Sequence, residues 1–116
     1  MNPILTGSLS AMVKSSNSLK EICKSDLTEG DWIFVKTCNS LYSIQVGKDG
    51  IYSVAGGWFD RNGVSRMPMT IRGCTWGGSA IKTTVIAACG LRLEFGNRLV
   101  TSPIQGIFIV PNSRTN

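Results

Sequence analysis

Apolar and polar residues alternate along much of the chain after Asp31, and this period of two predicts β-strands. The segments 32–37, 41–46 and 51–54 follow the pattern and are separated by short polar turns. The turn at 47–50 ends in Asp-Gly, which is typical of tight hairpins because both residues tolerate a positive φ. We therefore predict a three-stranded antiparallel meander over residues 31–54.

The rest of the chain contains shorter apolar runs between glycine-rich turns. These runs predict further strands at 67–76, 91–95, 98–102 and 107–110. The segment 79–88 fits either a strand or a turn of helix. Gly73 and Gly106 are typical of positions where a strand bends sharply. The unbroken apolar run at 107–110 indicates burial on both faces, or a strand edge that pairs with a neighbouring subunit.

The segment 5–22 is the one helical candidate, since its apolar residues recur every three or four positions. Gly7 and the run 15–18 are weak helix formers. We expect either a short, interrupted helix that covers one end of a sheet or a flexible arm.

Six to eight short strands with glycine-rich corners predict a mainly β protein, and in particular a small, strongly bent antiparallel β-barrel. Residues 1–30 would form the short N-terminal helix or arm, and residues 31–112 a single barrel domain. A length of 116 residues suits one domain. We expect Phe34 and Leu93 to belong to the core, an assignment that depends on which face of each strand is buried.

The amino-acid composition limits both the cellular compartment and the kinds of reaction that we expect for this protein. The chain has no histidine, which removes the usual general base, and it carries none of the common catalytic motifs, so we do not expect an enzyme. None of the four cysteines forms a Cys-x-x-Cys pair, so we expect neither a metal nor another cofactor. Without a signal-peptide pattern or a long apolar run, a cytoplasmic protein with free thiols and no membrane partner is expected.

The loop predicted at 58–64 contains Trp58 and Phe59 close to Arg61. Two aromatic rings beside a cation could offer a stacking platform for a base or a sugar. Alternatively, both rings tuck back into the barrel mouth or into a subunit interface. The same two alternatives apply to Trp76, which precedes two glycines.

The stretch Ile71-Arg72-Gly73-Cys74 resembles the second sequence motif of Sm, LSm and Hfq-related proteins. The resemblance is to a remote Sm-like protein of the bacterial or phage type. The resemblance covers these four residues and the bent strands that precede them. It implies an Sm-like or SH3-like barrel, a homo-oligomeric ring and an RNA pocket on its inner rim. Arg72 and Gly73 would belong to that pocket.

We therefore expect a homo-oligomeric ring that binds RNA or single-stranded DNA. Arg72 would be the rim cation, and Trp58, Phe59 and Arg61 would form a stacking patch. The net charge of +5 is compatible with phosphate contacts, for example from Lys48. Two alternatives stay open: an assembly or protein-interaction module without nucleic acid, and a domain that binds a small molecule or carbohydrate.

Overall fold

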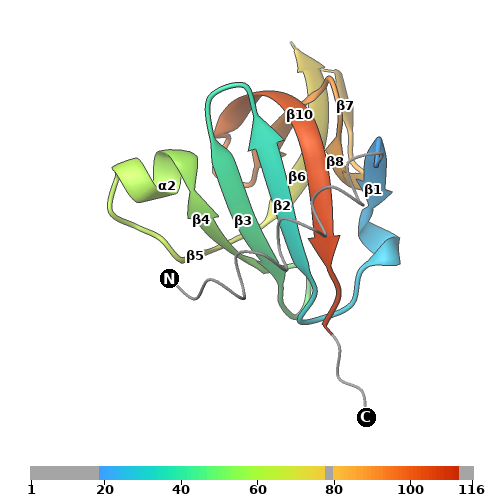
Figure 1. Cartoon of the computed structure of the whole chain (residues 1–116), viewed down its shortest axis with the longest axis vertical. Coiled ribbons are helices and arrows are strands. Elements are labelled where there is room, and N and C mark those ends of the chain that lie inside the picture. Colours follow the sequence, from blue (N-terminus) through green and yellow to red (C-terminus); the bar gives the residue numbers. More distant parts are fainter. Residues whose placement is uncertain (1–18, 78–79, 113–116) are drawn as a thin grey trace, which may run out of the picture.

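The computed structural model describes residues 19–77 and 80–112 (Figure 1). The predicted helix or arm over 5–22 lies mostly outside these residues. Within them the elements, in chain order, are β1 (Glu21–Cys23), the 3-10 helix η1 (Lys24–Asp26), β2 (Trp32–Thr37), β3 (Leu41–Val46), β4 (Tyr52–Gly56), α2 (Gly57–Arg61), β5 (Met67–Met69), β6 (Ile71–Gly77), β7 (Ala80–Lys82), β8 (Val85–Ala88), β9 (Arg92–Phe95) and β10 (Val100–Val110).

Eight of these strands form one antiparallel sheet in the order β5-β4-β3-β2-β10-β9-β6-β7, so the prediction of a mainly β, antiparallel fold is confirmed. The predicted meander is present as β2, β3 and β4. Its second turn contains Asp49 at φ 56° and Gly50 at φ 78°, as the Asp-Gly pair requires.

The sheet curls because its two halves share one stretch of chain. β5 pairs with β4 near one end of the sheet, and β6 pairs with β9 near the other, although only Thr70 separates β5 from β6. The single strand expected over 67–76 is therefore broken at Thr70, whose carbonyl accepts the Gly96 N–H at 2.8 Å. Among the described strands no ladder joins the two edge strands, β5 and β7, so hydrogen bonding does not close the sheet into a barrel.

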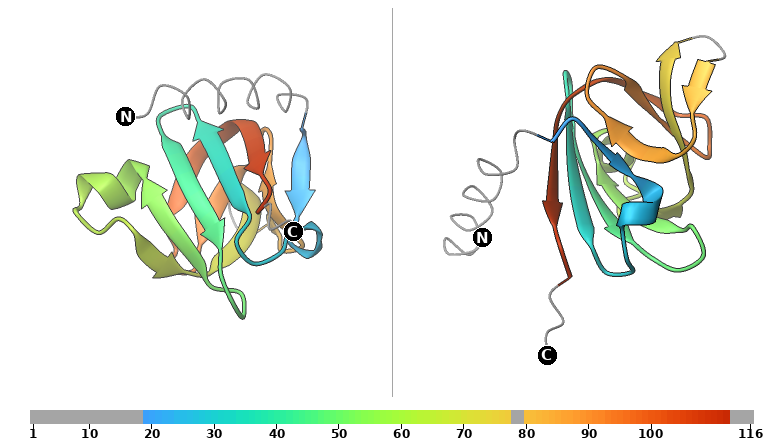
Figure 2. Two further views of the ribbon diagram at one scale, coloured as in Figure 1. Left: turned by 60° about the horizontal axis from the view of Figure 1, so that its bottom comes forward. Right: turned by 90° about the vertical axis from the view of Figure 1, so that its right-hand side faces the viewer.

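The longest strand, β10, corrects the expectation of two separate strands at 98–102 and 107–110. Its first part pairs with β9 and its second part with β2, and the change of partner occurs between Pro103 and Ile104. The register shifts between Ile104 and Gly106, as expected of a glycine at a bend. Figure 2 shows β10 curving over the body of the molecule.

The segment before residue 31 contributes to the packed structure. Glu21–Cys23 forms β1, which pairs with β8, and Ile22 joins the core. The helical prediction is therefore wrong at residues 21 and 22, because pairing with a buried strand overrides a weak helical pattern. The sequence allows either a strand or a turn of helix over 79–88. The structure has two strands there, β7 and the buried β8.

The core lies inside the curled sheet, and α2, which packs beside β4, and β8, which packs against β6 and β9, both contribute buried residues to it. Leu93 is fully buried, as expected, whereas Phe34 is only half-buried and lies on the opposite face of the sheet. The predicted loop at 58–64 is wrong in its first part, which forms α2. No helix in the described residues is long and apolar enough to cross a membrane.

Candidate nucleic-acid interface

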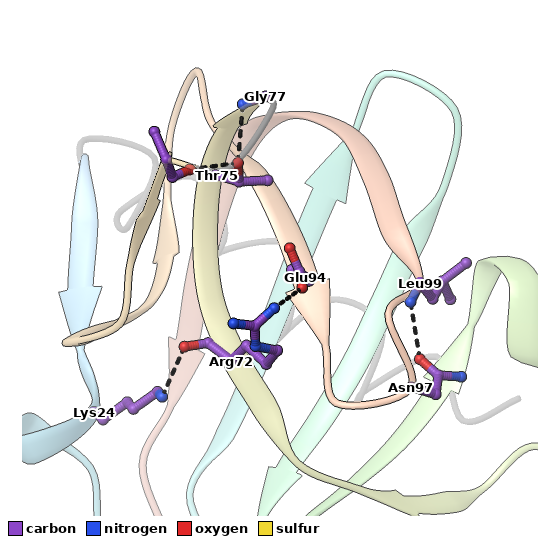
Figure 3. A network of polar contacts seen from close by, with 8 residues as sticks. Lys24, Arg72, Thr75, Gly77, Glu94, Asn97 and Leu99 are labelled. Atoms are coloured by element: carbon purple, nitrogen blue, oxygen red, sulfur yellow. Dashed lines mark hydrogen bonds and ion pairs between the residues drawn. The ribbon is translucent and has the colours of Figure 1, made fainter.

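Arg72, the cation suggested by the family resemblance, points outward from β6 and forms an ion pair with Glu94 of β9 (Figure 3). Its backbone carbonyl accepts a hydrogen bond from the Lys24 Nζ at 3.2 Å. A carboxylate therefore already neutralises the guanidinium, which reduces its attraction for a phosphate.

Gly73 occupies a bulge of β6, where the register against β9 shifts. It is buried, has φ 145° and lies against the backbone of Lys82 and Thr83. Its role in this structure is to let two strands approach closely. The neighbouring Cys74 thiol is also buried, and burial raises its pKa to about 11, so it is a poor nucleophile.

Trp58 and Phe59 lie on α2, which packs beside β4. Phe59 is fully buried and makes edge-to-face contacts with Tyr42 and Phe95, at ring centroid distances of 6.3 and 5.1 Å. Trp58 is half-buried and packs edge-on against Phe59 at 5.3 Å. Phe59 consequently has no free face for a ligand, and we remove it from the candidate interface.

The remaining two predicted residues lie at opposite ends of the β3–β4 hairpin. Arg61 of α2 donates to the Ser40 hydroxyl at 3.4 Å, just before β3 begins. Lys48 lies in the tight turn at the other end. In the described residues no hydrogen bond or ion pair links Lys48, Arg61 and Arg72 to one another. The structure therefore places Trp58, Phe59 and Arg61 on one short helix but does not bring the three predicted cations together.

A different group of residues converges on the outer face of the sheet, which is the side of β4, β3, β2 and β10 that faces away from the core. Trp32 and Phe34 alternate with the fully buried Ile33 and Val35 and so point to this face. Their rings are nearly parallel, with an interplanar angle of 10° and centroids 6.2 Å apart. The two rings form a continuous aromatic surface along β2.

Two apolar side chains of the neighbouring strand β10 extend this surface. Phe108 of β10 lies opposite Phe34, and Val110 lies opposite Trp32. Phe108 and Val110 are both half-buried. On the other side, Ser43 of β3 lies opposite Phe34, so the aromatic surface is apolar toward β10 and polar toward β3.

Arg66 adds a cation to the polar side of the face. Its guanidinium carbon lies 4.7 Å from the centre of the Trp32 ring. One terminal nitrogen donates to the Ser53 carbonyl at 2.8 Å and contacts the Ser53 hydroxyl at 3.3 Å, and the other donates to the Ser43 hydroxyl. Arg66 thus reaches over β4 and β3 to the tryptophan of β2.

The segment that carries Arg66 is held in place by Asp60. This carboxylate accepts hydrogen bonds from the Ser65 hydroxyl and from the Gly56 N–H, the latter at 3.1 Å. These bonds, together with the nearby charge of Arg66, lower the pKa of Asp60. Asp60 is therefore ionised at neutral pH and ties the end of β4 to the residue next to Arg66.

The sequence does contain a signal for this face. Trp32 and Phe34 are two residues apart in a strand, so they must share a face, while Ile33 and Val35 share the other. What the alternation leaves undecided is which of these two apolar sets faces the core. Arg66 follows a loop, and strand periodicity does not place it.

Comparison with models of known protein families, with curated proteins and with solved structures found no match. A function can therefore be proposed only from the geometry of this chain.

Proposed function

We propose that this protein binds single-stranded nucleic acid on the outer face of the sheet. The observation that carries the proposal is the parallel pair of Trp32 and Phe34, which projects from a strand on the side opposite the core. Every base has an aromatic face, so adjacent rings on a sheet can stack unpaired bases without reading their sequence. Bases within a duplex are already stacked on one another and cannot occupy such a surface.

Charge supports the same choice of ligand. The chain has a net charge of +5, and two cations lie on or beside the aromatic surface. Lys36 is two residues beyond Phe34 on the same face and is exposed, and Arg66 covers Trp32. Among the described residues, the ion pairs involve Arg72 and Lys82, so neither Lys36 nor Arg66 is paired with a carboxylate there. Both cations raise the positive potential of the face, which attracts a polyanion such as single-stranded nucleic acid.

The experiment measures fluorescence anisotropy of a labelled single-stranded DNA, and of the matching RNA, about 16 nucleotides long, which is the upper end of common site sizes. Phe34→Ala should weaken binding roughly tenfold because it removes a stacking surface, and Trp32→Ala should do the same because it removes the ring against which Phe34 and Arg66 pack. Trp76→Ala is the matched control: Trp76 is 63% exposed but lies on β6, away from this face, so its loss should leave binding unchanged.

Binding should also weaken steeply between about 50 mM and about 200 mM salt, and a duplex of the same sequence should bind more weakly. The proposal fails if the wild type does not bind at low salt, or if Trp76→Ala and Trp32→Ala have equal effects. Light scattering on the same variants tests the alternative that this face is an assembly surface. If Trp32→Ala changes the mass of the particle but not its affinity for oligonucleotides, the face is an assembly surface.

The homo-oligomeric ring implied by the family resemblance stays a prediction. The same light-scattering measurement on the wild type tests it, since a monomer would contradict a ring.

A further inference from the structure

We infer that Arg66 contacts the nucleic acid through the flat face of its guanidinium, stacking on a base, and not through its N–H groups on a phosphate. This inference rests on the proposed function. It identifies Arg66 as an affinity-determining residue of the site, and it makes an unpaired base, not the phosphate backbone, the group that Arg66 recognises.

The hydrogen-bonding pattern of the guanidinium leads to this conclusion. A guanidinium has five N–H donors around its edge. In this structure donors of both terminal nitrogens are directed at the protein, toward Ser43 on β3 and Ser53 on β4. A phosphate is bound most strongly by two parallel N–H groups of such a fork. Both terminal nitrogens already donate to the sheet, so a phosphate that used their end-on pair of N–H groups would have to compete with Ser43 and Ser53.

The flat face of the Arg66 guanidinium, unlike its terminal N–H groups, is not taken up by hydrogen bonds to the sheet. Arg66 lies over the Trp32 ring and is nevertheless exposed, so part of its surface is open to solvent above the sheet. A planar cation stacks favourably on an aromatic ring, and bases stack on arginine planes as they do on aromatic side chains. Ser43 and Ser53 hold the plane in position before the ligand arrives, which reduces the ordering cost of binding.

The test compares two single strands of equal length, one intact and one without bases, which keeps all the phosphates. Arg66→Lys preserves the charge but removes the plane. It should weaken binding of the intact strand roughly tenfold and leave binding of the abasic strand unchanged, with the same salt dependence as the wild type. Arg92→Lys, the same exchange on β9 and outside this face, is the control, and it should leave binding of both strands unchanged.

Ser43→Ala provides a second, milder variant that neither changes charge nor removes the guanidinium. It releases one terminal nitrogen, so it should weaken binding of the intact strand about threefold and leave the abasic strand unchanged. Thermal unfolding of each variant shows whether the fold is retained.

Failure of this inference is distinguishable from failure of the proposed function. If Trp32→Ala weakens binding but Arg66→Lys binds both strands like the wild type, the face binds nucleic acid and the role of Arg66 is wrong. If Arg66→Lys weakens both strands equally, Arg66 contacts phosphate. If the wild type binds neither strand, the proposed function itself is wrong.

Discussion

Gly73 and Lys82 approach each other so closely that a β-carbon on Gly73 would lie 2.1 Å from the Lys82 carbonyl oxygen. The contact joins β6 to the end of β7 at a bulge, where Gly73 also has φ 145°. Backbone atoms on both sides leave no flexible group that could move aside. This glycine is therefore required by the fold, whatever the family motif implies about a ligand.

Gly73→Ala should lower the free energy of unfolding by about 3 kcal/mol, since it adds a backbone clash to an unfavourable φ. Urea denaturation measures the change. Gly77→Ala is the matched control on the same strand: Gly77 has φ 120°, but nothing lies within 4 Å of its β-carbon position. It should cost only about 1 kcal/mol from backbone strain. Equal effects of the two substitutions would contradict the close approach of Lys82.

The two faces of the sheet predict losses of stability of different size for two residues that the sequence pattern treats alike. Leu93 is fully buried, so Leu93→Ala should lower the free energy of unfolding by about 3 kcal/mol. Phe34 lies on the outer face, so Phe34→Ala should cost only about 1 kcal/mol, from lost contacts with Trp32 and Phe108. A larger loss for Phe34→Ala than for Leu93→Ala would mean that the faces are assigned the wrong way round.

Phe34 also shows where prediction from the sequence stops. The meander, the Asp-Gly hairpin and the bends at Gly73 and Gly106 depend on local backbone preferences, and the structure confirms them. Local preferences do not decide which side of β2 is buried, because both sides carry large apolar residues. Only the packing of strands that are distant in sequence decides that Ile33 and Val35 face the core.

The candidate site was missed for a related reason. Trp58 and Phe59 attract attention as adjacent aromatic residues, but a short helix turns Phe59 into the core. Arg66 is far from Trp32 in the sequence, and no local pattern predicts that it reaches across two strands. Arg72 was identified by a four-residue resemblance, and its partner Glu94 lies on another strand.

Acidic pH should weaken the junction at which Asp31 holds two distant segments together. Burial alone would raise the pKa of Asp31, but hydrogen bonds from the Asn112 N–H and from the Thr28 N–H and hydroxyl outweigh it and lower the pKa. Because the folded pKa lies below the ordinary value of 3.8, the stabilisation is complete above that value and is lost as the pH falls through the folded pKa.

Asp31→Asn should therefore lower the free energy of unfolding by about 1 kcal/mol at neutral pH, and the difference from the wild type should shrink at about pH 3. Urea denaturation at both pH values measures it. Asp49→Asn, in an exposed hairpin turn, is the control and should change little at either pH. A difference that grows toward acidic pH would contradict this role of Asp31.

The position of β10 has a consequence for how the chain folds as it is synthesised. β2 is complete at Thr37, yet its second partner is β10, the last of the described strands, and the contacts between them span most of the chain. The meander can form early, but the sheet cannot be joined until residue 110 has left the ribosome. Such long-range pairing costs loop-closure entropy and slows folding. Until then, one edge of β2 and the apolar residues beside it lack their partner strand, and this period is when the nascent chain most needs protection from aggregation.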